Sequence, residues 1–239
     1  MSKRLLLIVA GLILFLAFVC FSYLVHRNHF TASDFNTTVR LQDHLPRRLD
    51  GPFSFLSEVG KFEVVTIVLI ALFLVFRKIK AGIIALGFYI GFHLIEIYGK
   101  YFVHHPPPPQ FMVRTTDLLP LSPFEVRSQN SYPSGHAGRA LFLSAIILVL
   151  LWQSKRVNLP LKIFGTLCVA GYDGVMLLSR VYLGEHWFSD IIGGSLLGAA
   201  FGLFASVFLL NTHQHSSHTE KKTIWSHFPK YKIEIKKEE

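Results

Sequence analysis

The stretch "LLLIVAGLILFLAFVCFSYLV" at residues 5–25 contains no charged side chain. A helix that crosses the hydrocarbon core of a bilayer needs about 20 mostly apolar residues, and this stretch meets that requirement. The basic start "MSKR" before it resembles that of a signal peptide, but the apolar run is too long and no small-residue cleavage site follows. We therefore expect an uncleaved membrane span here and, with it, the fold class of an all-α polytopic membrane protein.

The rest of the chain repeats this pattern. Hydrophobic residues make up 51% of it and charged residues 16%, whereas an average soluble domain has about 25% charged residues. Gly194, Gly198 and Gly202 recur every four residues, a spacing typical of a helix-packing face. We expect one six-span domain over residues 1–211 and a basic cytoplasmic tail over residues 212–239. The five further spans are expected at residues 55–76, 81–103, 135–152, 161–178 and 187–210.

The positive charges lie in short clusters between the apolar runs. Lys3 and Arg4, the cluster at 77–80, the cluster at 155–162 and the tail would all lie on one side of a six-span bundle. Because positive loops stay on the cytoplasmic side, we expect a protein of the cell membrane with both termini in the cytoplasm. The net charge of +9 is spread over these clusters rather than over one face, so no nucleic-acid partner is expected. The expected partner is the lipid bilayer.

Ionisable side chains gather near the outer ends of the last four predicted spans. Such groups are costly inside a membrane, face the interior of the bundle and mark functional sites. We therefore expect a polar site between these spans at the outer face. The residues concerned are His93, Glu96, Lys100, His136, Arg139, Asp173, Arg180, His186 and Asp190, and all but His93 and Asp173 cluster toward one membrane face.

His186 and Asp190 are four residues apart at the start of the last span, which places them one helical turn from each other. A carboxylate at that distance holds one ring nitrogen of the imidazole and stabilises a positive ring. His136 supplies a second imidazole in the same region. One histidine is thus expected to act as a nucleophile while the other protonates the leaving group.

"PSG" at residues 133–135 is typical of a helix start, with Ser134 as the N-cap. The exposed N–H groups at and after Gly135 then form an anion site at the positive end of the helix dipole. Lys100 and Arg180 add positive charge. Donors of this kind suit the equatorial oxygens of a transferring phosphoryl group.

These residues carry a family resemblance. "YPSGH" at 132–136 and "SRVYLGEHWFSD" at 179–190 resemble the second and third signature motifs of the type-2 phosphatidic acid phosphatase (lipid phosphate phosphatase) superfamily, which also includes the vanadium haloperoxidases. The third motif, S-R-x5-H-x3-D, is matched at every defined position, and the resemblance covers residues 60–210. The matching residues are Ser179, Arg180, His186 and Asp190.

The resemblance implies a helical bundle core of the vanadium haloperoxidase and acid phosphatase type. It implies a phosphatase that uses no metal and no cofactor and acts on a lipid phosphate monoester or pyrophosphate, such as phosphatidic acid, phosphatidylglycerol phosphate or a polyprenyl pyrophosphate. His186 would form a phosphohistidine, Asp190 would orient it, and His136 would be the general acid. The phosphate would be held by Lys100, Ser134, Gly135 and Arg180.

The first motif of the family departs from its pattern in this chain. The family has Lys, six residues and then Arg-Pro, and "KYFVHHPPP" supplies Lys100 and Pro108 but has Pro107 in place of the arginine. Arg139 follows His136 by three residues and so shares its helical face. We therefore expect Arg139 to supply the missing cation. Weaker substitutes are His104, His105, Arg114 and Arg127.

Other interpretations of the same residues stay open. The polar set would also suit an inactive lipid-phosphate binder or transporter, or an intramembrane serine protease that uses Ser134. Glu96 is expected to pair with Lys100 one turn away, and Asp173 with Arg180. No ligand spacing for a metal accompanies His104 and His105. The sequence does not choose among the candidate lipids.

Overall fold

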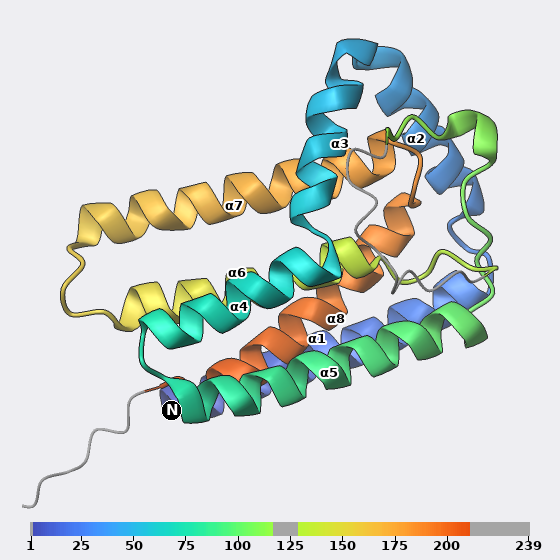
Figure 1. Cartoon of the computed structure of the whole chain (residues 1–239). Helices are drawn as coiled ribbons and strands as arrows, with labels where there is room; N and C mark the ends of the chain where they lie inside the picture. The colour runs from blue at the N-terminus through green and yellow to red at the C-terminus, as the bar shows by residue number, and fades with distance from the viewer. Residues whose placement is uncertain (1, 117–128, 211–239) are drawn as a thin grey trace, which may run out of the picture.

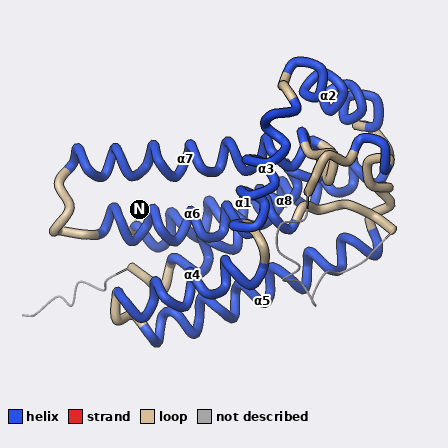
Figure 2. The backbone as a smooth tube through the Cα atoms, turned by 45° about the horizontal axis from the view of Figure 1, so that its top comes forward, coloured by secondary structure: helices blue, strands red, loops and turns tan. Residues whose placement is uncertain are grey.

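The computed structural model describes residues 2–116 and 129–210, and every regular element within these ranges is a helix (Figure 1, Figure 2). The predicted tail at 212–239 and Arg127 lie outside the described residues. The elements are α1 (Lys3–His26), α2 (Thr31–His44), η1 (Arg47–Leu49), α3 (Asp50–Val59), α4 (Phe62–Val75), α5 (Ile79–Phe102), η2 (Gln110–Met112), α6 (Gly135–Gln153), α7 (Leu159–Tyr182) and α8 (Phe188–Ser206).

Five of these helices, α1, α5, α6, α7 and α8, are long and apolar enough to cross a membrane. They confirm five of the six expected spans. The span expected at 55–76 is wrong as one helix, because the chain breaks into α3 and α4 at Gly60 and Lys61. Lys61 has extended backbone (φ −64°, ψ 152°) and forms an ion pair with Glu58 at 2.8 Å. With 14 residues, α4 is a shorter apolar helix of ~21 Å. The five spans and this helix are roughly consistent with the six spans expected.

Helix α8 lies in the middle of the bundle, where it contacts α1, α5 and α6. The glycine stripe of α8 permits its close approach to α6. A Cβ atom at Gly198 would lie 2.6 Å from the Cα of Gly138, and one at Gly202 would lie 2.8 Å from the Cβ of Ala145. The predicted helix-packing role of this stripe is therefore confirmed.

The outer surfaces of α1 and α7 are apolar. Leu16 and Tyr23 on α1 and Phe164 and Leu167 on α7 are all exposed. A soluble protein rarely exposes so many large apolar side chains along whole helices. These faces are instead suited to lipid, so the chain is a multi-pass membrane protein.

The two ends of the bundle differ in character. At one end the start of α1, the α4–α5 turn and the end of α8 meet (Figure 1), where Lys78 Nζ donates to the carbonyl of Leu209 at 2.6 Å and Arg4 Nη2 to that of Leu210 at 3.5 Å. The opposite end carries α2, α3 and the start of α6. The basic clusters and the predicted site thus lie at opposite ends of the molecule.

Candidate active site

The start of α6 is tied to the start of α8. Ser134 is the N-cap, and its Oγ accepts a hydrogen bond from the N–H of Ala137 at 3.4 Å. The N–H of Ser134 donates to the carbonyl of Asp190 at 3.0 Å. The first N–H groups of a helix have no intrahelical acceptor, and those of Gly135 and His136 find none among the described residues. Two N–H donors at the start of α6 are therefore free within the described ranges, and their binding of an anion stays a prediction.

Tyr132 anchors the segment that precedes α6. Its ring stacks on Phe18 of α1 with centroids 6.2 Å apart, and its hydroxyl is hydrogen-bonded to Ser22 Oγ at 2.8 Å. The ring also fills the space beside Gly193, where an added Cβ would overlap it. The "YPSGH" motif is thus held against both α1 and α8.

A tight turn brings Arg180 and His186 together. The carbonyl of Arg180 accepts hydrogen bonds from the N–H groups of Glu185 at 3.2 Å and His186 at 3.4 Å. Gly184 has φ +69°, a left-handed conformation that other residues rarely adopt. The turn therefore places His186 directly before α8, with its ring over the first turn of that helix.

His186 and Asp190 make the contact that their spacing predicts. His186 Nδ1 lies 3.3 Å from Asp190 Oδ2, which also accepts the N–H of Trp187 at 2.9 Å, and Asp190 is completely buried. With Nδ1 engaged, Nε2 is the nitrogen left for chemistry. Burial lowers the pKa of His186, and the charges of Lys100 and Arg180 act in the same direction, while Asp190 opposes them. His186 is therefore biased toward the neutral form.

His136 lies in the same pocket. Its Nε2 is buried and has no hydrogen-bond partner among the described residues. A Cβ atom at Gly60 would lie 2.8 Å from its ring, so the break between α3 and α4 lets the backbone pass close to the histidine. The charged groups that act on His136 are Arg180, Arg139, His186 and Lys100. The structure thus brings both predicted histidines and three predicted cations to one place.

Arg180 is completely buried, and its partners differ from the prediction. Its guanidinium bonds Ser57 and Glu185, and its Nε has no hydrogen-bond partner in the described part of the chain. The expected pairing with Asp173 is wrong, because Asp173 accepts a hydrogen bond from Ser144 Oγ at 2.8 Å instead. The Nε–H of Arg180 is therefore a free donor within the described structure.

Arg139 is buried beside the start of α6. Its Nε donates to the carbonyl of Gly60 at 2.9 Å, and its Nη1 lies 3.8 Å from Glu96 Oε2. Glu96 also accepts from His93 Nδ1 at 2.9 Å, so its ion-pair partners are His93 and Arg139 rather than the expected Lys100. A Cβ atom at Gly135 would lie 2.7 Å from Arg139 Nη1. The guanidinium is therefore next to the free N–H groups, while Pro107 is exposed.

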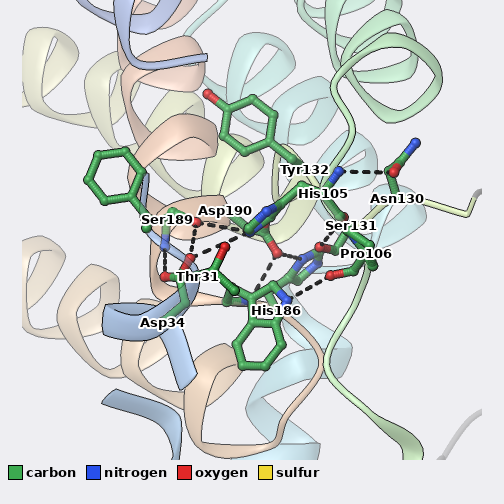
Figure 3. A network of polar contacts seen from close by, with 12 residues as sticks. Thr31, Asp34, His105, Pro106, Asn130, Ser131, Tyr132, His186, Ser189 and Asp190 are labelled. Carbon is green, nitrogen blue, oxygen red and sulfur yellow. Dashed lines mark hydrogen bonds and ion pairs between the residues drawn. The ribbon is translucent and has the colours of Figure 1, made fainter. Parts of the chain in front are cut away.

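The other sequence-predicted cations occupy different places. Lys100 is half-buried, and its charge acts on both His136 and His186. His104 is exposed. Arg114 lies over the ring of Tyr182, 5.1 Å from its centroid, and donates to the carbonyl of Gln42. His105 lies behind Asp190, among buried polar groups (Figure 3). Of the weaker substitutes for the missing arginine that the structure describes, none matches the placement of Arg139.

Three residues that contact Arg180 or His105 in the structure were not predicted from the sequence. Glu185 and Ser57 hold Arg180, and Asp34 of α2 lies behind Asp190 next to His105. Glu185 stands inside the third motif, between its arginine and its histidine, and that position was the available signal. Nothing in the local sequence marks Ser57 or Asp34, because their partners are distant along the chain.

Comparison with known proteins gives three findings. A family model described as "PAP2 superfamily" matches residues 78–214. The chain is similar to an undecaprenyl-diphosphatase of Sulfolobus acidocaldarius, with 37% identity over 153 residues; the matched segment covers 63% of this chain and 66% of that relative, just under two thirds of its length.

Among solved structures, the chain is similar to the first transmembrane PAP2-type phosphatidylglycerolphosphate phosphatase from Bacillus subtilis. The TM-score is 0.63 at 22% identity, over 82% of this chain and 93% of that one. At this identity the likeness shows the fold alone. It confirms the predicted all-α membrane bundle.

Proposed function

We propose that this chain, which belongs to the PAP2 superfamily, is a membrane phosphatase that hydrolyses a lipid phosphate monoester or diphosphate through a phosphohistidine on His186. One observation carries the proposal most strongly. His186 is held by Asp190 through Nδ1, and no hydrogen bond engages its Nε2 within the described structure. The charge of the buried Arg180 acts on this ring, and the ring acts in turn on His136 at the start of α6. A nucleophile next to an unfilled anion site is what phosphoryl transfer requires.

In the first step, His186 Nε2 forms a bond to phosphorus while the bond from phosphorus to the leaving oxygen breaks. His136 Nε2 gives its proton to that oxygen, and the phosphoryl oxygens bind the free N–H groups of Gly135 and His136 together with Arg180 and Lys100. Asp190 stabilises the positive ring that forms. In the second step His136 takes a proton from water, whose oxygen attacks phosphorus and releases phosphate and free His186.

A lipid substrate fits the surroundings of the site. An apolar hollow of about 310 Å³ lies between α4, α6 and α7, lined among others by Val59, Val65 and Leu143. Val59 directly precedes Gly60, which contacts His136. An acyl or prenyl chain in this hollow would hold its phosphate near the histidines. Because the 37% identical relative is named for undecaprenyl diphosphate, we place a polyprenyl diphosphate first among the candidates.

We place the enzyme in the cell membrane with both ends of the domain in the cytoplasm and the site at the outer face. The basic clusters support this orientation, since positive loops favour the cytoplasmic side and lie at the end opposite the histidines.

The test is phosphate release by the full chain purified in detergent. Polyprenyl diphosphate, phosphatidic acid and phosphatidylglycerol phosphate are offered in the presence of EDTA, with His186→Ala as the inactive variant and His104→Ala, an exposed histidine, as the matched control. We expect release that vanadate inhibits and that only His186→Ala abolishes. Lipid binding without release would instead support an inactive binder or transporter. Release insensitive to vanadate but lost in Ser134→Ala would support a serine hydrolase, although Ser134 Oγ is buried and already caps α6.

A further inference from the structure

A buried polar network lies on the side of Asp190 that faces away from His186 (Figure 3). His105 Nε2 is 3.5 Å from Asp190 Oδ1, 3.5 Å from Asp34 Oδ2 and 3.1 Å from Ser189 Oγ. Asp34, His105, Ser189 and Asp190 are each at most 4% exposed. The mechanism above uses only Asp190 of this group, so the other three have no role in it yet.

The hydrogen bonds determine where the protons lie. Asp34 accepts from the N–H of Ser189 at 2.8 Å and from its hydroxyl at 2.7 Å. A hydroxyl has one proton to donate, and that of Ser189 is given to Asp34. Ser189 Oγ therefore accepts from His105, whose Nε2 must carry a proton.

Charge indicates further that the ring of His105 carries a proton on both nitrogens and is a cation. Asp34 and Asp190 are two buried carboxylates, both within 3.5 Å of one nitrogen. Buried like charges repel strongly unless a cation separates them. Burial by itself lowers the pKa of His105, but the hydrogen bond to Asp34 and the charges of Asp190 and Asp34 outweigh it and raise that pKa. The ionisable groups that face the ring are Asp34 from α2, Asp190 from α8 and Tyr132, whose ring is perpendicular to it at 6.4 Å.

The backbone also fixes His105 in place. Its N–H donates to Asn130 Oδ1 at 3.0 Å, and its carbonyl accepts the N–H and the hydroxyl of Ser131 at 2.9 and 3.2 Å. The carbonyl of Pro106 accepts the indole N–H of Trp187 at 2.7 Å. The loop after α5 is thus bound to the segment before α6 and to the residue between His186 and α8.

We propose that His105 is a positioning residue that acts as a cation on Asp190 Oδ1, orienting this carboxylate toward His186 and moderating its charge, with Asp34 and Ser189 holding His105. The inference rests on the proposed function of the site. Asp34 belongs to α2, which precedes residues 78–214 of the family match, so the helix has a function in the site that this match does not cover. Without the cation, the unopposed charge of Asp190 would raise the pKa of His186.

The test compares His105→Gln, which keeps an N–H donor but no charge, with His104→Gln at the neighbouring exposed histidine. Two readouts are followed against pH: kcat for phosphate release, and the protonation of His186 by ¹⁵N NMR of histidine-labelled protein, which needs no turnover. For His105→Gln we expect kcat to fall ~10-fold with KM unchanged, and the titration of His186 to move upward by about one pH unit. The acid limb of kcat should move upward with it, because the nucleophile must be neutral.

Asp34→Asn is the second variant, for the case that His105→Gln does not fold. It removes an anion and leaves His105 charged at acid pH, so the titration of His186 should move downward, opposite to the first variant. An unchanged His186 titration in whichever variants fold would overturn the proposal. Absence of phosphate release from wild type would contradict the proposed function instead, while the NMR titration would still decide the role of His105.

Discussion

Arg139 has two candidate roles, and removing it separates them. In one, its guanidinium binds the substrate phosphate beside Gly135; in the other, it only neutralises the buried carboxylate of Glu96. Arg139→Ala removes the hydrogen bond to the carbonyl of Gly60 at 2.9 Å and the ion pair with Glu96 at 3.8 Å. Glu96 would keep His93 as its ion-pair partner within the described structure.

The expected loss of stability follows from these contacts. A hydrogen bond from a charged donor contributes about 1.5–3 kcal/mol, and breaking a buried ion pair costs about 3–5 kcal/mol when the remaining charge is fully uncompensated. His93 still offsets part of the Glu96 charge, so the ion pair contributes at the lower end of that range. The two contributions overlap, so we expect a destabilisation of about 4 kcal/mol in Arg139→Ala. Glu96→Gln in the same chain removes the uncompensated charge and should recover about half of this loss.

Activity should behave differently from stability. Removing one donor to a developing oxyanion lowers kcat by about 10²–10³-fold, and we expect a loss of this size in kcat/KM for Arg139→Ala. The loss should persist in the double variant Glu96→Gln/Arg139→Ala, since the phosphate still lacks its cation.

The assay pairs thermal unfolding in detergent with kcat/KM on the preferred lipid, for wild type, both single variants and the double variant. Arg156→Ala, at an exposed arginine on the opposite end of the molecule, is the matched control. If the double variant has the kcat/KM of Glu96→Gln, Arg139 serves only as the counter-ion of Glu96 and the reasoning is refuted.

Three further predictions concern packing and charge. Gly135→Ala should lower kcat/KM at least ~10-fold and destabilise the protein by about 1–3 kcal/mol, because its Cβ would overlap the Glu96 carboxylate and the Arg139 guanidinium; kinetics and thermal unfolding check both. Gly198→Leu should prevent α6 and α8 from approaching each other, so no folded, monodisperse protein is expected in gel filtration. The control Gly87→Ala, where an added Cβ meets no atom within 4 Å, should leave the protein folded and monodisperse. Lys100→Met should move the acid limb of kcat to higher pH, because the charge of Lys100 lowers the pKa of His186 and its removal raises that pKa; an unmoved limb in the pH profile would contradict this.

The long helices were predictable because each apolar run is itself long enough to cross a bilayer. The residue spacing in the motifs also transferred directly to geometry: Ser134 caps α6, and His186 meets Asp190 one turn away. These are local relations, decided by helix periodicity and capping chemistry.

What sequence patterns missed depends on contacts between distant residues. At the break, the backbone of Gly60 passes close to His136 and Met176, a contact between distant residues. The charged Glu58, Lys61 and Glu63 next to it are its one local signal in the sequence. Glu96 lies one turn from Lys100, yet it pairs with Arg139 of another helix, because both side chains are buried at the start of α6. Asp34 lies on a short polar helix whose sequence does not indicate that it reaches His105 across the fold.

The central claim is that His186 becomes covalently phosphorylated. It is tested most directly by acid-free rapid quenching of the enzyme with a lipid diphosphate labelled with ³²P at its terminal phosphate. We predict a labelled protein whose phosphate is stable to alkali and labile to acid, as expected for a phosphorus–nitrogen bond, and whose label is absent in His186→Ala but present in Ser134→Ala. Label that persists in His186→Ala would contradict the claim.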